Sequence, residues 1–289
     1  MKFYVLGAAG MAGHTISMYL EEQGHDVVGF DLTKAAHIKS SIAGDARDTA
    51  KIAQVIKEGQ FDAIINCIGI LNQFAEEKKA LAVFLNSYFP HFLADVTSDM
   101  KTMVVHMSTD CVFSGKRGGY RENDLRDGET FYDRSKALGE LQDSKNITLR
   151  NSIVGPDTNP RGIGLFNWFM QQTGEINGYT HAMWTGQTTL QLAKTMEAAV
   201  REGATGLYNM VPDKAISKYD LLKLFNRYMR KDALMIHPND VNAYDKSLRR
   251  TRFDFPYIIP DYEEMVAQMS GWIRRHAALY PHYQLQEAE

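Results

Sequence analysis

The sequence of 289 residues lacks several features that would define other classes of protein. Its two cysteines, Cys67 and Cys111, are too few for a disulfide scaffold or a metal cluster, and they fit a reducing compartment such as the cytoplasm. No apolar run approaches the ~20 residues needed to span a bilayer, and the chain enters a predicted strand directly rather than a signal peptide. The formal net charge is −3, without a basic block. We therefore expect a cytoplasmic protein with no membrane or nucleic-acid partner.

What is present is typical of a globular α/β enzyme. Hydrophobic residues make up 44% and charged residues 23% of the chain, close to globular averages. Short apolar strands are predicted at 2–6, 26–30, 62–66, 103–107 and 147–150. Helices are predicted at 11–23, 48–58, 74–98 with a break or kink at Pro90, 132–142, 163–173, 189–202, 217–230 and 261–278.

This alternation predicts a doubly wound parallel sheet of the Rossmann type, covered by helices on both faces. We expect residues 1–154 to form a dinucleotide-binding domain and residues 155–289 a smaller, mostly helical substrate lobe. The lobe is expected to be discontinuous, because the run 207–211 fits a strand that rejoins the main sheet.

A glycine-rich turn between the first strand and the first helix predicts the cofactor site. It reads Gly7-Ala8-Ala9-Gly10-Met11-Ala12-Gly13. Closely spaced glycines let the backbone approach a pyrophosphate, and the helix that follows presents unpaired N–H groups. Asp31 ends the second strand, where a carboxylate can bind ribose hydroxyls and repel a 2′-phosphate. NAD(H) is therefore favoured, while the nearby Lys34 leaves NADP(H) open.

Tyr132 and Lys136 are the strongest candidates for catalysis. Residues four apart share one face of a helix. An ammonium beside a phenol stabilises the phenolate, so we expect Lys136 to lower the pKa of Tyr132 from its usual ~10 and make it a proton donor at neutral pH. The Ser108-Thr109-Asp110 turn follows the fourth strand, and its hydroxyls either cap a turn or orient a substrate carbonyl.

In these motifs the chain resembles the extended short-chain dehydrogenase/reductases, and within them the dTDP-4-dehydrorhamnose reductases. The matching segments are 104–115 (VVHMSTDCVFSG), 132–140 (YDRSKALGE), Leu149-Arg150 and 206–211 (GLYNMV), with an asparagine of the middle helix at Asn86. The resemblance implies NAD(P)H-dependent reduction of a nucleotide-linked 4-keto-6-deoxy sugar for polysaccharide biosynthesis. Tyr132 is expected to protonate the C4 oxygen, Lys136 to bind the nicotinamide ribose, and Thr109, with Ser108, to orient the carbonyl.

The resemblance also implies further binding residues. Asp45-Ala46 corresponds to the segment at the adenine edge, and Cys67-Ile68-Gly69 to the turn beside the pyrophosphate and ribose, with Met107 at the end of the fourth strand. Asp45 could instead cap the following helix. On the substrate side we name Asp110, Ile153 and Trp184, the last of which could equally be a core residue.

Several positions depart from the family pattern. Cys111 stands where the related sugar dehydratases have a glutamate and the reductases usually have tyrosine, so dehydration is not expected. Thr15 stands where some reductases have a metal-binding glutamate, and we expect no metal. The C-terminal basic cluster Lys246, Arg249, Arg250 and Arg252 is either a diphosphate site or a solvated loop. An epimerase, a non-catalytic regulatory subunit like that of methionine adenosyltransferase, and a homodimer stay open.

Overall fold

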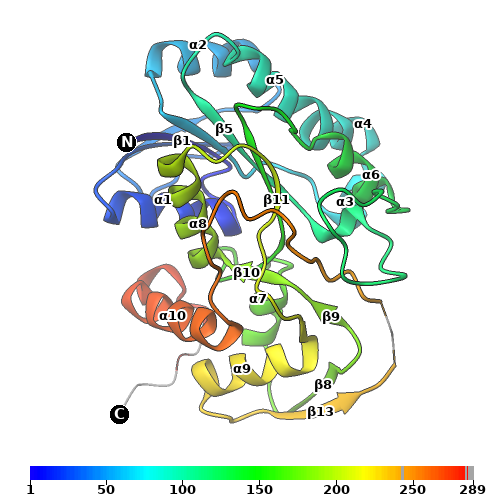
Figure 1. Cartoon of the computed structure of the whole chain (residues 1–289). Helices are drawn as coiled ribbons and strands as arrows, with labels where there is room; N and C mark the ends of the chain where they lie inside the picture. Colours follow the sequence, from blue (N-terminus) through cyan, green and yellow to red (C-terminus); the bar gives the residue numbers. More distant parts are fainter. Residues whose placement is uncertain (242–243, 284, 286–289) are drawn as a thin grey trace.

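The computed structural model describes residues 1–241, 244–283 and 285, and a seven-stranded sheet forms its centre (Figure 1). The order is β11-β6-β5-β4-β1-β2-β3, and every neighbouring pair is parallel. The strands are β1 (Lys2–Leu6), β2 (Asp26–Asp31), β3 (Ser40–Ala43), β4 (Ala63–Asn66), β5 (Met103–Ser108), β6 (Ile147–Arg150) and β11 (Gly206–Asn209). The predicted doubly wound α/β fold is confirmed.

The central strand β1 is buried on both faces because helices cover both. Phe3 and Val5 belong to the core beneath α1 (Met11–Glu22) and α8 (Thr189–Glu202). Tyr4 and Leu6 belong to a second core beneath α2 (Thr49–Gly59) and α5 (Phe89–Val96). All four side chains are fully buried, as a strand in the middle of a parallel sheet requires.

The remaining helices and short strands either lie near the carboxyl edge of the sheet or belong to the second half of the chain. Near the edge are α3 (Asn72–Glu77), α4 (Lys79–Ala82), the π-helix η1 (Val83–Tyr88), the 3₁₀-helix η2 (Asp110–Val112) and α6 (Phe131–Leu138). The second half adds β7 (Ser152–Val154), α7 (Leu165–Met170), β8 (Glu175–Tyr179), β9 (Met183–Trp184), β10 (Gly186–Thr188), β12 (Ile216–Ser217), α9 (Lys218–Arg230), β13 (Met235–Asn239), α10 (Tyr262–Arg275) and η3 (Ala277–Leu279). Figure 1 shows α9, α10, β8 and β13 gathered at one end of the molecule.

The five predicted strands of the first half are confirmed, and so is the pairing of the 207–211 run, which contains β11, with β6. Between β2 and α2, where no helix or strand was predicted, the chain forms the edge strand β3. The irregular joins expected in the second half contain three two-stranded ladders, whose strands are only two to five residues long. The division of the chain at residue 155 stays a prediction.

The helix predicted at 74–98 is interrupted at Lys78, between α3 and α4, and from Lys79 to Val96 it continues as α4, η1 and α5, with Pro90 in the first turn of α5. The π-helix η1 precedes Pro90 and α5 begins at Phe89. Proline has no N–H to donate to the carbonyl four residues earlier, so the hydrogen-bond register changes there. The carbonyl thereby released, that of Asn86, lies so close to Gly139 that a Cβ on Gly139 would come within 1.9 Å of it. Gly139 is the C-cap of α6, which stops at Leu138 rather than at the predicted Gln142.

A buried histidine joins the first helix to the C-terminal segment. His14 of α1 is fully buried, its Nδ1 lies 3.0 Å from the carbonyl of Gly10, and its Nε2 lies 2.8 Å from the hydroxyl of Tyr280. Burial, the largest cause, lowers the pKa of His14 to about 4, and the nearby His37 acts in the same direction. The folded protein therefore holds this imidazole neutral.

Acidification should destabilise the fold through His14. With a folded pKa of about 4 and an unfolded pKa near 6.5, the unfolded chain binds more protons in this window, so stability falls as pH drops below ~6.5. Between pH 7.5 and pH 5.0 we expect His14 to account for about 2 kcal/mol of lost unfolding free energy. Urea unfolding of His14→Gln, compared with the parent at both pH values, measures this contribution. Parallel losses in the two proteins would contradict it.

Candidate active site

The glycine turn after β1 brings two backbone segments into close contact. Gly7 has φ +83°, and a Cβ there would lie 3.1 Å from the carbonyl carbon of Cys67. A Cβ on Gly13 would lie 2.0 Å from the carbonyl oxygen of Gly7. Glycine is therefore required at both positions, once for the positive φ and once for the close approach of α1 to the turn. The amino end of α1 is left facing the space above the sheet, as an anion site requires.

A cavity of about 610 Å³ opens beside this turn. It lies where the chain order of the sheet reverses, between β1 and β4, which is the usual place for a dinucleotide in this architecture. The predicted residues that line it are Gly7, Gly10, Asp31, Asp45, Ala46, Cys67, Ile68 and Gly69. The lining residues that sequence reasoning missed are Phe30, Leu32, Gly44, Arg47, Lys78, Leu81 and Leu85.

Six predicted cofactor residues lie outside the cavity lining, namely Met11, Ala12, Gly13, Met107, Tyr132 and Lys136. Gly13 and Ala12 lie within α1, where Ala12 is 7% exposed. The sulfur of Met11 is directed at Gly164, 3.0 Å from where a Cβ would be. Met107 contributes only its carbonyl, which accepts a hydrogen bond from Nζ of Lys136 at 2.6 Å. These residues shape the site rather than line it.

Asp31 points back at the glycine turn. One carboxylate oxygen accepts a hydrogen bond from the N–H of Ala9 at 2.9 Å, and the other accepts one from the N–H of Leu32 at 2.7 Å. These two bonds hold the carboxylate on the cavity wall, with lone pairs left for a ligand hydroxyl. The placement is the one predicted from the sequence.

Tyr132 and Lys136 both lie buried on α6. A capping box formed by Thr130 and Asp133 starts the helix directly before Tyr132. Tyr132 packs in a small cluster with Ala75 and Ala82, and Cys111 is packed against the same cluster. Nζ of Lys136 lies at the end of β5, bonded to the carbonyl of Met107.

The expectation that Lys136 lowers the pKa of Tyr132 is wrong for this structure. Burial, the largest cause, raises the pKa of Tyr132 above its ordinary value, and the nearby Cys111 acts in the same direction. The physical reason is that the Lys136 ammonium is directed to Met107 and lies 3.5 Å from Nε2 of His106. Burial also lowers the pKa of Lys136, to about 8. At neutral pH the phenol therefore keeps its proton and the lysine stays predominantly charged.

The hydroxyls of Ser108 and Thr109, at the end of β5 and in the turn after it, have different hydrogen-bond partners. Oγ1 of Thr109 donates to Asp110 at 3.1 Å and accepts from the N–H of Cys111 at 3.1 Å, while its hydroxyl also favours the ionised form of Tyr132. Asp110 is buried, which raises its pKa. Ser108 donates instead to the carboxylate of Glu140 at 2.6 Å. The expectation that Ser108 acts with Thr109 at a substrate carbonyl is therefore wrong for this structure, because the hydroxyl of Ser108 donates its hydrogen bond to Glu140.

Glu140 accepts that proton as part of a buried ion pair that the sequence did not single out. Its carboxylate receives Nε of Arg150 at 2.8 Å and Nη2 at 2.7 Å, and both side chains are fully buried. Arg126 binds the same carboxylate from the surface, and Asn209 of β11 accepts from Arg150 at 3.2 Å. Both charged residues lie in segments quoted for the family resemblance, which is the only sequence signal that could have found them.

The predicted substrate residues of the second half divide into core and surface. Trp184 is 6% exposed and its ring packs against Tyr262 at 5.6 Å, so it is a core residue and its predicted place in the sugar pocket is wrong. Ile153 is half-buried in β7 and packs against the same core. Asp110 lies next to β7, where Ser152 helps to offset the effect of burial on its pKa.

Two members of the basic cluster have structural tasks. Arg250 donates to the carbonyls of Arg252, Phe255 and Tyr257, which holds its own loop together. Arg252 stacks on Tyr208 at 4.0 Å and pairs with Asp254. For these two arginines, the predicted diphosphate contact is wrong.

Lys246 faces the catalytic helix, and Arg249 is exposed. Nζ of Lys246 lies 3.9 Å from the carboxylate of Asp133, the residue after Tyr132. The segment around it is bound to the 115–120 turn, where Tyr120 donates to the carbonyl of Ser247 at 2.9 Å and Arg249 donates to the carbonyl of Tyr120 at 2.7 Å. Lys246 is thus the member of the cluster that reaches the site.

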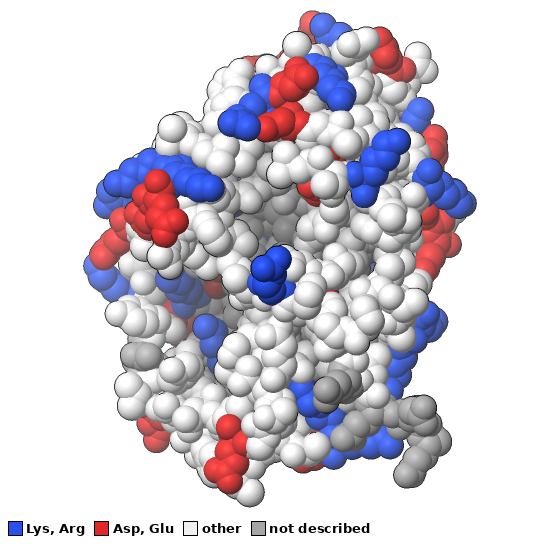
Figure 2. All heavy atoms as spheres, turned by 180° about the vertical axis from the view of Figure 1, so that it is seen from behind, with Lys and Arg blue, Asp and Glu red and all other residues white. Residues whose placement is uncertain are grey.

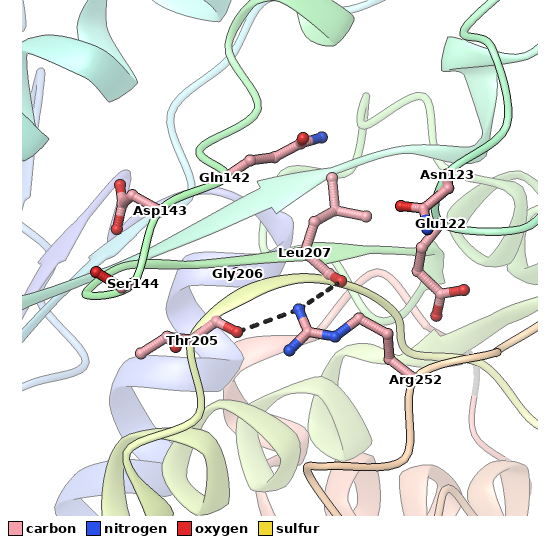
Figure 3. Close-up of a pocket in the computed structure, with 9 residues that line it drawn as sticks. All are labelled: Glu122, Asn123, Gln142, Asp143, Ser144, Thr205, Gly206, Leu207 and Arg252. Atoms are coloured by element: carbon pink, nitrogen blue, oxygen red, sulfur yellow. Dashed lines mark hydrogen bonds between the residues drawn. The ribbon is translucent and has the colours of Figure 1, made fainter.

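A second cavity, of about 410 Å³, lies at the other edge of the sheet, beside β11 (Figure 3). Arg252 extends across it and donates to the outward-facing carbonyls of Thr205 and Leu207, each at 3.3 Å. Glu122 accepts from the N–H of Asn209 at 3.1 Å on the same strand. These bonds cover an edge strand that could otherwise pair with another chain.

The surface opposite to the view of Figure 1 has a hollow near its centre (Figure 2). Lys and Arg side chains lie on the rim of this hollow, and elsewhere on this face acidic and basic side chains are intermixed. In the described ranges 1–241, 244–283 and 285, no helix combines the length and the apolarity needed to cross a membrane. A cytoplasmic location and a homodimer stay predictions.

The fold and the site together define a doubly wound α/β protein with a cavity of the dinucleotide-binding type at the carboxyl edge of its sheet. A family model described as RmlD substrate binding domain matches residues 1–254, and the chain belongs to that family.

Curated relatives match over most of their length. A probable low-salt glycan biosynthesis reductase of Haloferax volcanii is 27% identical, over 87% of this chain and 88% of the relative. A dTDP-4-keto-6-deoxy-D-glucose reductase of Streptomyces niveus is 26% identical, over 82% of each chain. Among solved structures, a dTDP-4-dehydrorhamnose reductase of Bacillus anthracis in complex with NADP has a TM-score of 0.78 at 20% identity, covering 93% of this chain and 98% of that one. This structural likeness supports the fold.

Removal of the charge of Glu140 should be strongly destabilising. Glu140→Gln leaves the Arg150 guanidinium buried without a counter-ion, which typically costs about 3–5 kcal/mol of unfolding free energy. The matched control is Glu129→Gln, because Glu129 pairs with Lys116 in solvent. Urea unfolding of both variants tests the difference. A loss in Glu140→Gln no larger than in the control would show that the buried pair contributes little.

Proposed function

We propose that this chain reduces the keto group of a nucleotide-linked 4-keto-6-deoxy sugar with a nicotinamide cofactor. The observation that carries the proposal is the meeting of two sites at the carboxyl edge of the sheet. Cys67, directly after β4, lines the dinucleotide cavity, and Nζ of Lys136 donates to the carbonyl of Met107 at 2.6 Å near the end of β5, the strand that pairs with β4. A proton donor and a dinucleotide site at one edge are what carbonyl reduction requires.

The chain fits a dinucleotide through features of its own. The glycine turn leaves the backbone open to a pyrophosphate, Asp31 is positioned for the ribose hydroxyls, and the cavity extends past Ala46. When bound, the cofactor supplies hydride to the substrate carbon. Lys136 is the residue that we expect at the nicotinamide ribose.

The proton in this reaction comes from Tyr132. Because burial raises the pKa of this phenol, it is protonated at working pH and can donate to the oxygen that gains negative charge. Thr109 can orient that oxygen once its hydroxyl turns away from Asp110. The hydroxyl of Thr109 is the neighbouring group that favours the tyrosinate left after transfer. The Cys111 thiol, whose pKa burial raises to about 12, does not act as an acid in elimination.

The substrate class is supported by the relatives and by one cation. Two relatives carry reductase names, and one of those names specifies a dTDP-linked 4-keto-6-deoxy sugar. Such a substrate brings a diphosphate, which needs a cationic or N–H partner in a partly desolvated site. Lys246, beside Asp133, is the cation that we propose for this contact.

For the cofactor we propose NADH in preference to NADPH. The support is Asp31, whose carboxylate is held on the cavity wall by two backbone N–H groups. Lys34, which could have opposed this preference, is exposed and outside the cavity lining.

The direct test is a set of 4-keto nucleotide sugars, each incubated with NADH and with NADPH and followed at the nicotinamide absorbance. Oxidation of the cofactor that depends on the sugar supports the proposal. Interconversion of sugar epimers without net oxidation would indicate the epimerase alternative. No turnover, together with a co-purifying protein, would favour a regulatory subunit.

Tyr132→Phe should abolish turnover while NADH binding is retained. The ring still packs against Ala75 and Ala82, but the proton donor is gone, and such catalysis is typically worth ~10²–10⁴-fold in kcat. Steady-state kinetics and NADH titration of the same preparation separate the two effects. A variant with the parent rate would remove Tyr132 from the mechanism.

Lys246→Ala should raise the KM for the sugar nucleotide by the equivalent of about 1.5–3 kcal/mol, the range for a hydrogen bond to a charged group. NADH affinity should be unchanged, because Lys246 is outside the lining of the cofactor cavity. Arg249→Ala is the matched control, since its side chain is exposed on the same segment. An unchanged KM in Lys246→Ala would place the diphosphate elsewhere.

A further inference from the structure

The cofactor cavity contains positive charge that bears on the choice of cofactor. Of its lining residues in the part of the chain that the structure describes, two are cations, Arg47 and Lys78. Arg47 follows Asp45-Ala46 closely, on the wall of the cavity that also holds Asp31. The N–H of Gly44 donates to the carbonyl of Asp31 at 2.8 Å, which ties this wall together. A guanidinium near an adenosine ribose would ordinarily be a candidate for a 2′-phosphate.

In this structure, however, the guanidinium is already engaged. Nε of Arg47 lies 3.0 Å from each carboxylate oxygen of Asp45, and Nη2 lies 2.6 Å from Oδ2. The backbone N–H of Arg47 donates to the same carboxylate at 2.8 Å. These bonds lower the pKa of Asp45 to about 2, so the carboxylate is charged throughout the working pH range. Arg47 and Asp45 form a multiply hydrogen-bonded ion pair without net charge, which we call the fork.

We infer that Asp45 is a second determinant of cofactor choice, which keeps a latent 2′-phosphate site at Arg47 switched off. The inference rests on the proposed use of a nicotinamide dinucleotide. A 2′-phosphate placed beside the fork faces a guanidinium whose charge is cancelled, and it is repelled by the carboxylate 2.6 Å from that guanidinium. Asp31 adds a second negative charge on the same wall. Asp45 acts here as a specificity-determining residue, through Arg47.

Other lysines near this wall do not replace Arg47. Lys34 is exposed and outside the lining, and Nζ of Lys51 donates to the carbonyl of Ala43 at 2.9 Å. Lys78 lines the cavity from a different segment of the chain, the one that also contributes Leu81 and Leu85. Release of Arg47 from Asp45 is therefore the change that should alter 2′-phosphate binding most.

The test measures dissociation constants of NADH and NADPH directly, by titration of nicotinamide fluorescence, with no sugar present. Asp45→Asn keeps an oxygen for the Arg47 N–H but removes the charge, and it should raise the affinity ratio of NADPH to NADH about tenfold or more. The double variant Asp45→Asn, Arg47→Gln should lose the gain, because the guanidinium that Asp45→Asn releases is then absent. Lys34→Gln is the control and should keep the ratio of the parent. The use of a ratio cancels any adenine contact of Asp45 that both cofactors share.

Two results would overturn the inference alone. Binding of both cofactors with an unchanged ratio in Asp45→Asn would show that the fork does not control 2′-phosphate binding. An equal gain in the double variant Asp45→Asn, Arg47→Gln would show that the gain does not depend on Arg47. A parent protein that binds neither dinucleotide would overturn the proposed function, and the inference with it. The exposed position of the fork makes loss of folding unexpected, and the urea midpoint of each variant checks this.

Discussion

The buried ion pair of Glu140 and Arg150 is the interaction on which the active site most depends. Two charges without solvent exposure are tolerated only when hydrogen bonds satisfy them, and here four chain segments supply those bonds. Glu140 follows the catalytic helix, Arg150 ends β6, Ser108 ends β5 and Asn209 ends β11. The pair thus fixes the helix of Tyr132 and Lys136 against the carboxyl ends of three strands.

A second set of contacts fixes the same helix from the cofactor side. Asn86, fully buried in the π-helix, exchanges hydrogen bonds with the backbone of Ile70 at 2.9 Å and donates to Ser135 at 3.0 Å. Ser135 lies between Tyr132 and Lys136, and Ile70 directly follows the turn that lines the cavity. The π-helix before Pro90 carries the asparagine that makes these bonds, and irregular helix turns are often found at functional sites. The catalytic helix is held by polar contacts on two sides.

The sequence was most informative where one residue type has one physical reason to occur. Gly7 and Gly13 could be predicted because no side chain fits there, and Asp31 because a strand end leaves little freedom. Charge pairings were less predictable, since they depend on side chains far apart in the chain. Arg250 and Arg252 look alike in sequence to Lys246, yet local carbonyls and Asp254 engage them. The β7–β10 and β9–β12 ladders of the second half were missed because strands of two or three residues carry no periodic pattern.

The electrostatics of Tyr132 and Lys136 follow from burial more than from their spacing. Burial disfavours the charged form of each group, so it raises the pKa of the phenol and lowers that of the ammonium. Four residues of helix are enough to place both side chains on one face, but not to place the ammonium against the phenol. The lysine instead lies at Met107 and near Cys67, on the cofactor side. The free protein therefore holds its proton on the tyrosine, and this suits the role that we propose for Tyr132, donation of that proton to a carbonyl oxygen as negative charge develops there.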